Sequence, residues 1–462
     1  MRRRIVQTVV VALLSVCAFA IQSVAVAAPR IVISTPHAWQ VVQRDARGRA
    51  DIVVSGRCVD LRGGVRVSWH GRRATVRCSR GGRFSARLED VRAGQATLWV
   101  RSARIPGVFC FRRDVGVGDI YVIAGQSNAS GRSPYLFSYS NPVLRASMFG
   151  NDDRWKDLRD PVDSAVGQVD AVSQDNCAGG SVWPDVATIL LARTGVPVAF
   201  LPCARTSTPI ARWMPGLTPI RSGRTLYQSM ARRVAAAGGR VRAVLWWQGE
   251  RDARFLTPAP VYEASLDTLA DAVWRDFGAR LVVAQIGDYD ERYSEAGIDA
   301  VRLAQEVAWT QPHTVQGPVF YDIDLHDDVH FRTREDVAAA ARRWAAAILA
   351  GVLHKQAGRT PRLVRAEREG DEVVLTADAP LETGADLGGF VVRVDGQLVP
   401  IVSASAGGDT VRLRLGESAE GAVDVSLGEG RSAAGAAVPT DTSAWRLPML
   451  PFVGRPVSAA AP

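Results

Sequence analysis

The chain has 462 residues, of which 47% are hydrophobic and 22% are charged, and its formal net charge is +9. This length predicts two to four domains, and this apolar fraction excludes a disordered chain and indicates a globular protein with an ample core. The arginines are scattered along the sequence and do not cluster with aromatic residues. We therefore interpret the charge as a solvated basic surface, expect no nucleic-acid partner, and leave open an affinity for acidic polymers of the cell envelope.

Residues 1–27 have the pattern of a secretory signal peptide. Three arginines precede a long apolar stretch that ends with the small residues Ala25 and Ala27. We favour this interpretation over an uncleaved membrane anchor, because the small residues are typical of a cleavage site. No later stretch is long and apolar enough to cross a bilayer. The sequence thus predicts a secreted, periplasmic or otherwise extracytoplasmic protein without a membrane span after cleavage.

Export permits disulfide bonds between the cysteines that remain after cleavage. Cys58 and Cys78 flank short strand-like runs in one N-terminal region, and we expect them to pair. Five cysteines remain in the mature chain, so at least one of them has no intramolecular partner, and none has the spacing of metal ligands.

Two regions of short alternating strands flank a central region of a different kind. Residues 29–116 carry runs such as ADIVVSG and VRVSWHG between glycine-rich turns, which predicts a small sandwich-like all-β domain. Residues 358–450 return to this pattern and predict a second small all-β domain. We interpret residues 451–462 as a disordered tail.

The central region, residues 117–352, alternates apolar strands with helices. This pattern predicts a parallel sheet of five strands covered by helices on both faces. In such sheets, ligands bind at the carboxyl ends of the strands. The five expected strands are DIYVIAG, VPVAFLPCA, RAVLWWQGE, ARLVVAQIG and PVFYDID, and the expected helices between and after them include WPDVATILLART, TLYQSMARRVAAA, VYEASLDTLADAVWRDF and DAVRLAQEVAWT.

Ser127 follows the first central strand, in the stretch YVIAGQSNASG. A small polar residue at this place is typical of a helix N-cap, and it is also typical of a nucleophile held at the carboxyl end of a parallel strand. These eleven residues alone favour the N-cap. The nucleophile becomes the better interpretation only if the rest of the chain supplies a base for Ser127.

His330 is the candidate base, in the stretch LHDDVHFRTRED before the last helix, which we expect to begin after an N-cap at Thr333. His326 and His330 are four residues apart, which raises the alternative of a metal site, but a metal motif of this spacing needs both imidazoles on one helix face. Asp327 stands three residues before His330 and could orient its imidazole. We favour this second interpretation and expect no metal and no cofactor.

An acyl-transfer site also needs hydrogen-bond donors for the oxyanion. The second central strand runs into a small polar loop that contains Thr206 and Ser207, whose backbone N–H groups could serve. The third runs into Gln248, Glu250 and Asp252. We expect Gln248 to donate its amide to the oxyanion, and we favour structural support over direct catalysis for the two acids.

These stretches together resemble the SGNH-hydrolase superfamily, and within it the sialate O-acetylesterase-like and acetylxylan-esterase-like carbohydrate esterases. GQSN at 125–128 resembles the nucleophile block, WWQGERDA at 246–253 the third block, and DDVH at 327–330 the final block. GSVWPDVA and PCARTSTPIARW resemble family stretches between them. The resemblance covers roughly residues 118–350, about half of the chain, and four blocks in order are far more specific than any one of them.

The resemblance implies a three-layer α/β/α, flavodoxin-like domain and a serine esterase that removes acetyl groups from carbohydrates without a cofactor. It implies Ser127 as nucleophile, His330 as base and Asp327 as the partner of His330. The oxyanion and substrate-binding residues that we expect from these blocks are Gln126, Asn128, Thr206, Ser207, Gln248 and Glu250.

The second block departs from the family pattern, since many relatives have Gly-Gly-Thr where this chain has Thr206, Ser207 and Thr208. A glycine is needed there only if the backbone adopts a positive φ. The departure motivates the alternative of a non-catalytic carbohydrate-binding or cell-envelope protein on a degenerate esterase scaffold. The sequence names neither the sugar nor the oligomeric state.

Overall fold

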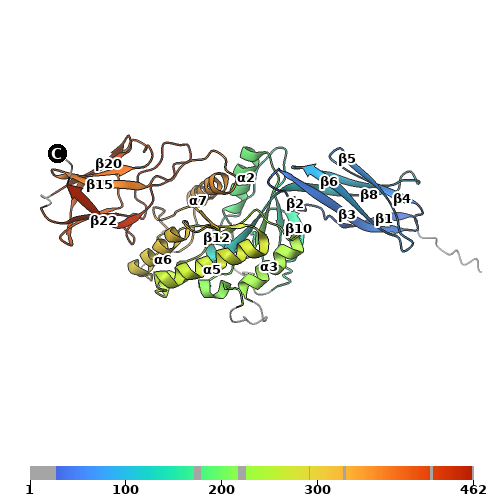
Figure 1. The fold of residues 1–462 in the computed structure, drawn as a ribbon, viewed down its shortest axis with the longest axis horizontal. Coiled ribbons are helices and arrows are strands. Elements are labelled where there is room, and N and C mark those ends of the chain that lie inside the picture. The colour runs from blue at the N-terminus through green and yellow to red at the C-terminus, as the bar shows by residue number, and fades with distance from the viewer. Residues whose placement is uncertain are drawn as a thin grey trace, which may run out of the picture.

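A computed structural model of the chain describes residues 28–170, 178–216, 225–290, 292–325, 329–416 and 420–459. The predicted signal peptide lies outside these residues. Three groups of elements follow one another along the long axis of the molecule, with the N-terminal strands at one end and the C-terminal strands at the other (Figure 1). No helix in the described ranges has the length and apolar character to span a membrane.

The N-terminal strands form two facing sheets. One has the order β1–β3–β6, and the other has the order β5–β4–β7–β8 with β2 paired to β8. A disulfide joins Cys58 on β3 to Cys78 after β5, which confirms the predicted pair. The strands are β1 (Arg30–Thr35), β2 (Val41–Gln43), β3 (Arg49–Val59), β4 (Gly64–Trp69), β5 (Arg72–Arg77), β6 (Arg83–Arg92), β7 (Gly94–Ser102) and β8 (Phe109–Gly125).

β8 continues from this region into the central sheet, whose spatial order is β10–β9–β11–β8–β12–β13–β14. All neighbours from β9 to β14 are parallel, and only β10 is antiparallel. The predicted domain boundary at residues 116 and 117 therefore falls inside one strand. The further strands are β9 (Ser147–Phe149), β10 (Trp155–Asp157), β11 (Val198–Pro202), β12 (Ala243–Trp247), β13 (Arg280–Val283) and β14 (Thr314–Gln316).

Two predictions for this sheet were wrong. The short strand β9 adds a sixth parallel strand to the five that we expected. The last parallel strand is β14, Thr314–Gln316, and the run PVFYDID that follows it forms no strand. This run is apolar because it passes between two cores: Phe320 packs in the central core, whereas Val319 and Tyr321 pack against the C-terminal strands.

Helices cover both faces of the central sheet, with α2 and α7 on one side of β12 and α3, α5 and α6 on the other (Figure 1). The predicted N-cap of the last helix is confirmed, because Thr333 and Asp336 form a reciprocal capping box. The helices are α1 (Ser127–Ser130), α2 (Trp183–Thr194), α3 (Leu226–Ala237), α4 (Glu250–Arg254), α5 (Ala259–Phe277), α6 (Glu295–Ala308) and α7 (Arg334–Ala347), with short turns η1 (Ile210–Trp213) and η2 (Ile348–Val352).

The C-terminal strands form one sheet with the order β18–β17–β21–β22–β15–β16–β20–β19. The prediction of a disordered tail was wrong for its described part, because β22 pairs with β21 and β15. The strands are β15 (Leu363–Glu369), β16 (Glu372–Ala377), β17 (Phe390–Val394), β18 (Gln397–Val399), β19 (Ile401–Gly407), β20 (Thr410–Leu415), β21 (Val423–Leu427) and β22 (Phe452–Ala459).

The arrangement places the candidate site at the point where the strand order reverses. In chain order, β8, β11, β12, β13 and β14 lie in the spatial order 2-1-3-4-5, which is that of flavodoxin-like sheets. The chain leaves β8 toward β9 and β11 on one side and then runs from β11 to β12 on the other side of β8, which makes the carboxyl end of β8 the switch point where ligands bind in such sheets. Ser127 lies at this end.

Candidate active site

A sharp turn after β8 presents Ser127. Gly125 has φ +131°, and a Cβ at this position would lie 2.0 Å from the carbonyl oxygen of Trp247, so only glycine fits. The N–H of Gln126 donates to the same carbonyl over 3.0 Å. The chain then enters the single turn α1, in which Ser127 is 4% exposed.

The imidazole of His330 lies beside the hydroxyl of Ser127. Its Nε2 lies 2.9 Å from Oγ of Ser127, although 203 positions separate the two residues in sequence. This is the distance at which an imidazole can take the proton of a serine hydroxyl. The predicted partner of His330, Asp327, and the alternative metal ligand, His326, lie outside the described residues.

The segment that carries Ser127 also holds the segment that carries His330. Nδ2 of Asn128 donates to the carbonyl of Val329 over 3.0 Å, and Oγ of Ser133 donates to the carbonyl of Arg332 over 2.8 Å. These two bonds fix the backbone on both sides of His330. Neither contact can be predicted from the sequence, because any residue type supplies a backbone carbonyl.

Asn128 is a positioning residue in this geometry. Its amide has two hydrogens, and the second bond runs to Oε1 of Glu250 over 2.7 Å. Both are therefore used inside the protein, and neither is left for an oxyanion. Glu250 is fully buried at the start of α4, and burial raises the pKa of its carboxyl to about 7, against a smaller lowering by the hydrogen bond from Asn128.

Gln248 is also committed to internal contacts. Its Nε2 faces the carboxylate of Asp252 at 2.6 Å, the carbonyl of Thr208 at 3.0 Å and Oε1 of Gln126 at 3.3 Å. Three acceptors already compete for its two hydrogens. The expectation that Gln248 donates to the oxyanion therefore does not fit this geometry.

Asp252 ties the loop of the second block to that of the third. It accepts from the N–H of Ile210 over 2.9 Å and from the hydroxyl of Thr257 over 2.9 Å, in addition to Gln248. Burial raises its pKa. These contacts agree with the expectation of structural support for this acid.

The loop with the substituted second block begins beside the nucleophile. The N–H of Arg205 donates to the carbonyl of Gly125 over 2.9 Å, and the guanidinium of Arg132 donates to Oγ1 of Thr206. Ser207 has φ +53°, the left-handed conformation that favours glycine. The loop thus has a left-handed backbone conformation, which favours glycine, at a position that serine occupies in this chain.

Ser207→Gly is expected to stabilise the folded protein by about 0.5–1 kcal/mol. The substitution removes left-handed strain of about 1–2 kcal/mol, and part of this gain is lost because glycine is more flexible in the unfolded chain. The Ser207 side chain is exposed and makes no hydrogen bond in the described residues, so little else changes. Denaturant unfolding of Ser207→Gly beside Ser207→Ala, which keeps Cβ, tests this. Equal stability of the two variants would contradict it.

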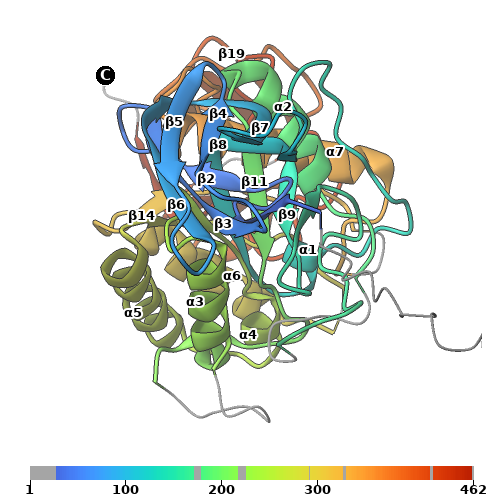
Figure 2. The ribbon, with the colours of Figure 1, turned by 90° about the vertical axis from the view of Figure 1, so that its right-hand side faces the viewer.

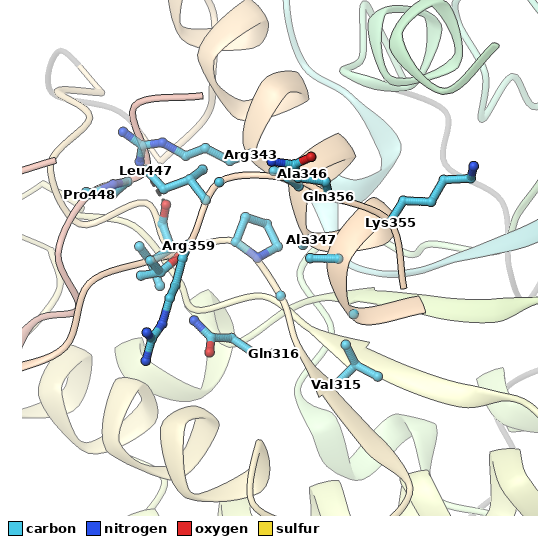
Figure 3. A pocket seen from close by; sticks show the side chains of 18 of the residues that line it. Val315, Gln316, Arg343, Ala346, Ala347, Lys355, Gln356, Arg359, Leu447 and Pro448 are labelled. Atoms are coloured by element: carbon cyan, nitrogen blue, oxygen red, sulfur yellow. Dashed lines mark hydrogen bonds between the residues drawn. The ribbon is translucent and has the colours of Figure 1, made fainter. Parts of the chain in front are cut away.

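A cavity of about 500 Å³ lies elsewhere, between β14, the end of α7 and the chain that leads to the C-terminal strands (Figure 3). It contains neither Ser127 nor His330. Two of its arginines are already paired, Arg343 with Asp322 at 2.6 Å and Arg359 with Asp378 at 2.5 Å. We interpret this cavity as a gap where the central region meets the C-terminal strands, and not as part of the candidate active site.

The site thus consists of a buried serine and an imidazole at the switch point of a doubly wound sheet, an arrangement typical of hydrolases with a serine nucleophile. Comparison with known proteins gives the family. Residues 117–350, half of the chain, match the family described as carbohydrate esterase, sialic acid-specific acetylesterase. The chain belongs to this family of carboxylic ester hydrolases.

Individual known proteins are similar to this chain. A probable carbohydrate esterase of Arabidopsis thaliana is 26% identical over 205 residues, which are 38% of this chain and 73% of that protein. The crystal structure of a carbohydrate acetylesterase from Xanthomonas citri has the same fold, with a TM-score of 0.64 and 23% identity over 91% of this chain and 99% of that chain. An Arabidopsis thaliana crystal structure has a TM-score of 0.42 and 22% identity over 51% of this chain and 99% of that chain.

Proposed function

We propose that this chain is a secreted serine esterase that removes acetyl groups from carbohydrates, with Ser127 as nucleophile and His330 as general base. The contact of 2.9 Å between Nε2 of His330 and Oγ of Ser127 carries the proposal. Asp327 completes the triad by its place in the D-x-x-H pattern, where a carboxylate would orient His330 and stabilise its charged form. The signal-like segment at residues 1–27 supports export.

The reaction follows from these positions. Oγ of Ser127 attacks the carbonyl carbon of the acetyl ester while His330 takes the hydroxyl proton. The tetrahedral intermediate collapses, the sugar oxygen leaves with the proton from His330, and the acetyl group stays on Ser127. His330 then takes a proton from water, the resulting hydroxide attacks the acetyl-serine, and acetate leaves as the proton returns to Ser127.

Backbone N–H groups are the proposed oxyanion donors. Within the described residues, the N–H groups of Ser127, Thr206 and Ser207 donate no hydrogen bond, whereas the side-chain amides of Asn128 and Gln248 are used. The bond from Arg205 to Gly125 holds the loop of Thr206 and Ser207 close to the nucleophile. Such fixed donors stabilise the negative charge that develops in acyl transfer.

Acetate release from a small set of esters tests this function. The set contains an aryl acetate, acetylated xylan and 9-O-acetyl sialic acid, each with Ser127→Ala as the blank. We expect wild type to release acetate from the aryl acetate and from at least one carbohydrate, and the better carbohydrate indicates the sugar class. A folded wild-type protein that releases acetate from none of them would favour the non-catalytic scaffold.

A further inference from the structure

An aromatic strip lies on the outer face of the N-terminal sheet β5–β4–β7–β8. Phe109 and Phe111 on β8 are 50% and 36% exposed, and Trp99 on the neighbouring β7 is half-buried. The ring centroid of Trp99 lies 5.6 Å from that of Phe109 and 5.1 Å from that of Phe111. A contiguous exposed aromatic strip is a candidate binding surface.

Arginines surround the strip. Residues directly opposite each other on neighbouring antiparallel strands share a face, and here Trp99 is opposite Phe111 and Arg101 is opposite both Phe109 and Arg66. Cζ of Arg101 lies 4.3 Å from the ring centroid of Trp99. The arginines of this face are Arg66, Arg73, Arg77, Arg101 and Arg113, and all are exposed. The expectation that arginines do not cluster with aromatic residues was therefore wrong, because the clustering crosses strands.

The positive charge of this face is not compensated. None of its five arginines forms an ion pair with any residue in the described ranges. The outer face of the other sheet, β1–β3–β6, differs: Arg57, Arg83 and Arg87 share it with Asp51 and Glu89, and Arg87 pairs with Asp51 at 3.2 Å. The first face therefore carries the larger uncompensated positive charge, which an anionic partner would complement.

A hollow of about 680 Å³ continues this face toward the central sheet. Phe111 and Arg113 line it together with Trp39 and Arg145, and Asp114 is its single carboxylate. The hollow extends the surface beyond the strands, as a site for a chain molecule requires. Figure 2 looks along the molecule onto the end that carries β4, β5, β7 and β8.

We propose that this face binds a polysaccharide whose sugars carry carboxylates. Aromatic rings offer apolar surface to the C–H faces of sugars, and arginine pairs with carboxylates through two parallel hydrogen bonds. That the ligand is a carbohydrate, and not a nucleic acid, rests on the proposed function. The part of the face on β8, from Phe109 to Arg113, lies roughly 45–60 Å from Ser127 along the chain, from the rise of about 3.3 Å per residue. It is thus a second site that raises the local concentration of polymer-borne esters.

Calorimetric titration of the full chain carrying Ser127→Ala tests the proposal with acyl-free ligands, so its outcome does not depend on esterase activity. The ligands are a galacturonate oligosaccharide, a neutral xylan oligosaccharide of equal length and a deoxythymidine oligonucleotide. Arg66→Ala/Arg101→Ala and Trp99→Ala are compared with the matched pair Arg57→Ala/Arg83→Ala, which removes two directly opposed arginines from the other sheet. Trp99→Phe keeps an aromatic ring.

We expect the galacturonate Kd to rise about tenfold or more in both face variants and to change by less than about twofold in the matched control, since each lost contact is worth about 1.4 kcal/mol or more. Trp99→Phe should retain most of the affinity, and added salt should weaken binding. Absent galacturonate binding, equal losses in the matched control, or equal binding of the neutral oligosaccharide would overturn the proposal. Tighter oligonucleotide binding that the same variants abolish would overturn it in favour of nucleic acid.

Discussion

Ser127→Ala and His330→Ala are each expected to lower kcat for an aryl acetate by about 10⁴-fold or more, and the double variant should be no worse than the poorer single variant. The reason is that the hydroxyl and the imidazole, 2.9 Å apart, transfer one proton as a unit. Without the hydroxyl there is no nucleophile for His330 to deprotonate, and without the imidazole there is no base to take the proton of Ser127. The rate that remains comes from substrate binding and the oxyanion donors.

A neighbouring serine provides the matched control for this cycle. Ser130 lies in the same helical turn and is also buried, but its hydroxyl donates to the carboxylate of Asp163 over 2.8 Å. Ser130→Ala should therefore lose stability and retain kcat within about tenfold. Losses that multiply in the Ser127→Ala/His330→Ala double variant would show that the two residues act independently. Unchanged thermal unfolding of Ser127→Ala excludes misfolding as the cause.

An element can be predicted from the sequence when its pattern of apolar and polar residues reflects a single packing environment. Helix α2 was predicted with the bounds observed, Trp183–Thr194, because its apolar residues and its terminal Gly195 point to one packed face and one stop. Strand β22 was missed because its exposed side chains and Pro456 suggest a tail. Its stability comes from backbone pairing with β21 and β15, which distant segments provide.

The same limit applies to the site. Ser127 and His330 could be proposed from sequence because four family blocks occur in order, although the strand predicted before the His330 block does not form. The contacts that bring them together could not, because Asn128 and Ser133 bind the carbonyls of Val329 and Arg332. Gln248 shows the same limit: a pattern names an amide but not the acceptors that its hydrogens contact in the fold.

Glu250 is expected to make the folded protein less stable as the pH rises from about 4.5 to 7. Burial raises the pKa of this carboxyl to about 7 in the folded state from 4.5 in the unfolded state. Between these values the folded protein keeps the proton that the unfolded chain has lost, so the free energy of unfolding falls by about 1.4 kcal/mol per pH unit. The stabilisation by the protonated carboxyl of Glu250 is fully present below pH 4.5. About 3 kcal/mol of the free energy of unfolding is lost once the pH exceeds 7.

Glu250→Gln isolates this contribution, because the amide oxygen can still accept from Asn128 while the side chain cannot ionise. Denaturant unfolding of both proteins across this pH range should show equal stability at the acid end and an advantage of about 3 kcal/mol for Glu250→Gln above pH 7. Asp160 and Asp288, whose pKa values burial raises to about 6, impose the same trend on both proteins and cancel in the difference. A difference that does not vary with pH would show that Glu250 stays in one protonation state. If Glu250→Gln and wild type have equal kcat at pH 5, the hydrogen bond from Asn128 to residue 250 positions the His330 segment without needing a charge. The ionised carboxylate of Glu250 then only lowers the stability of the folded protein above neutral pH.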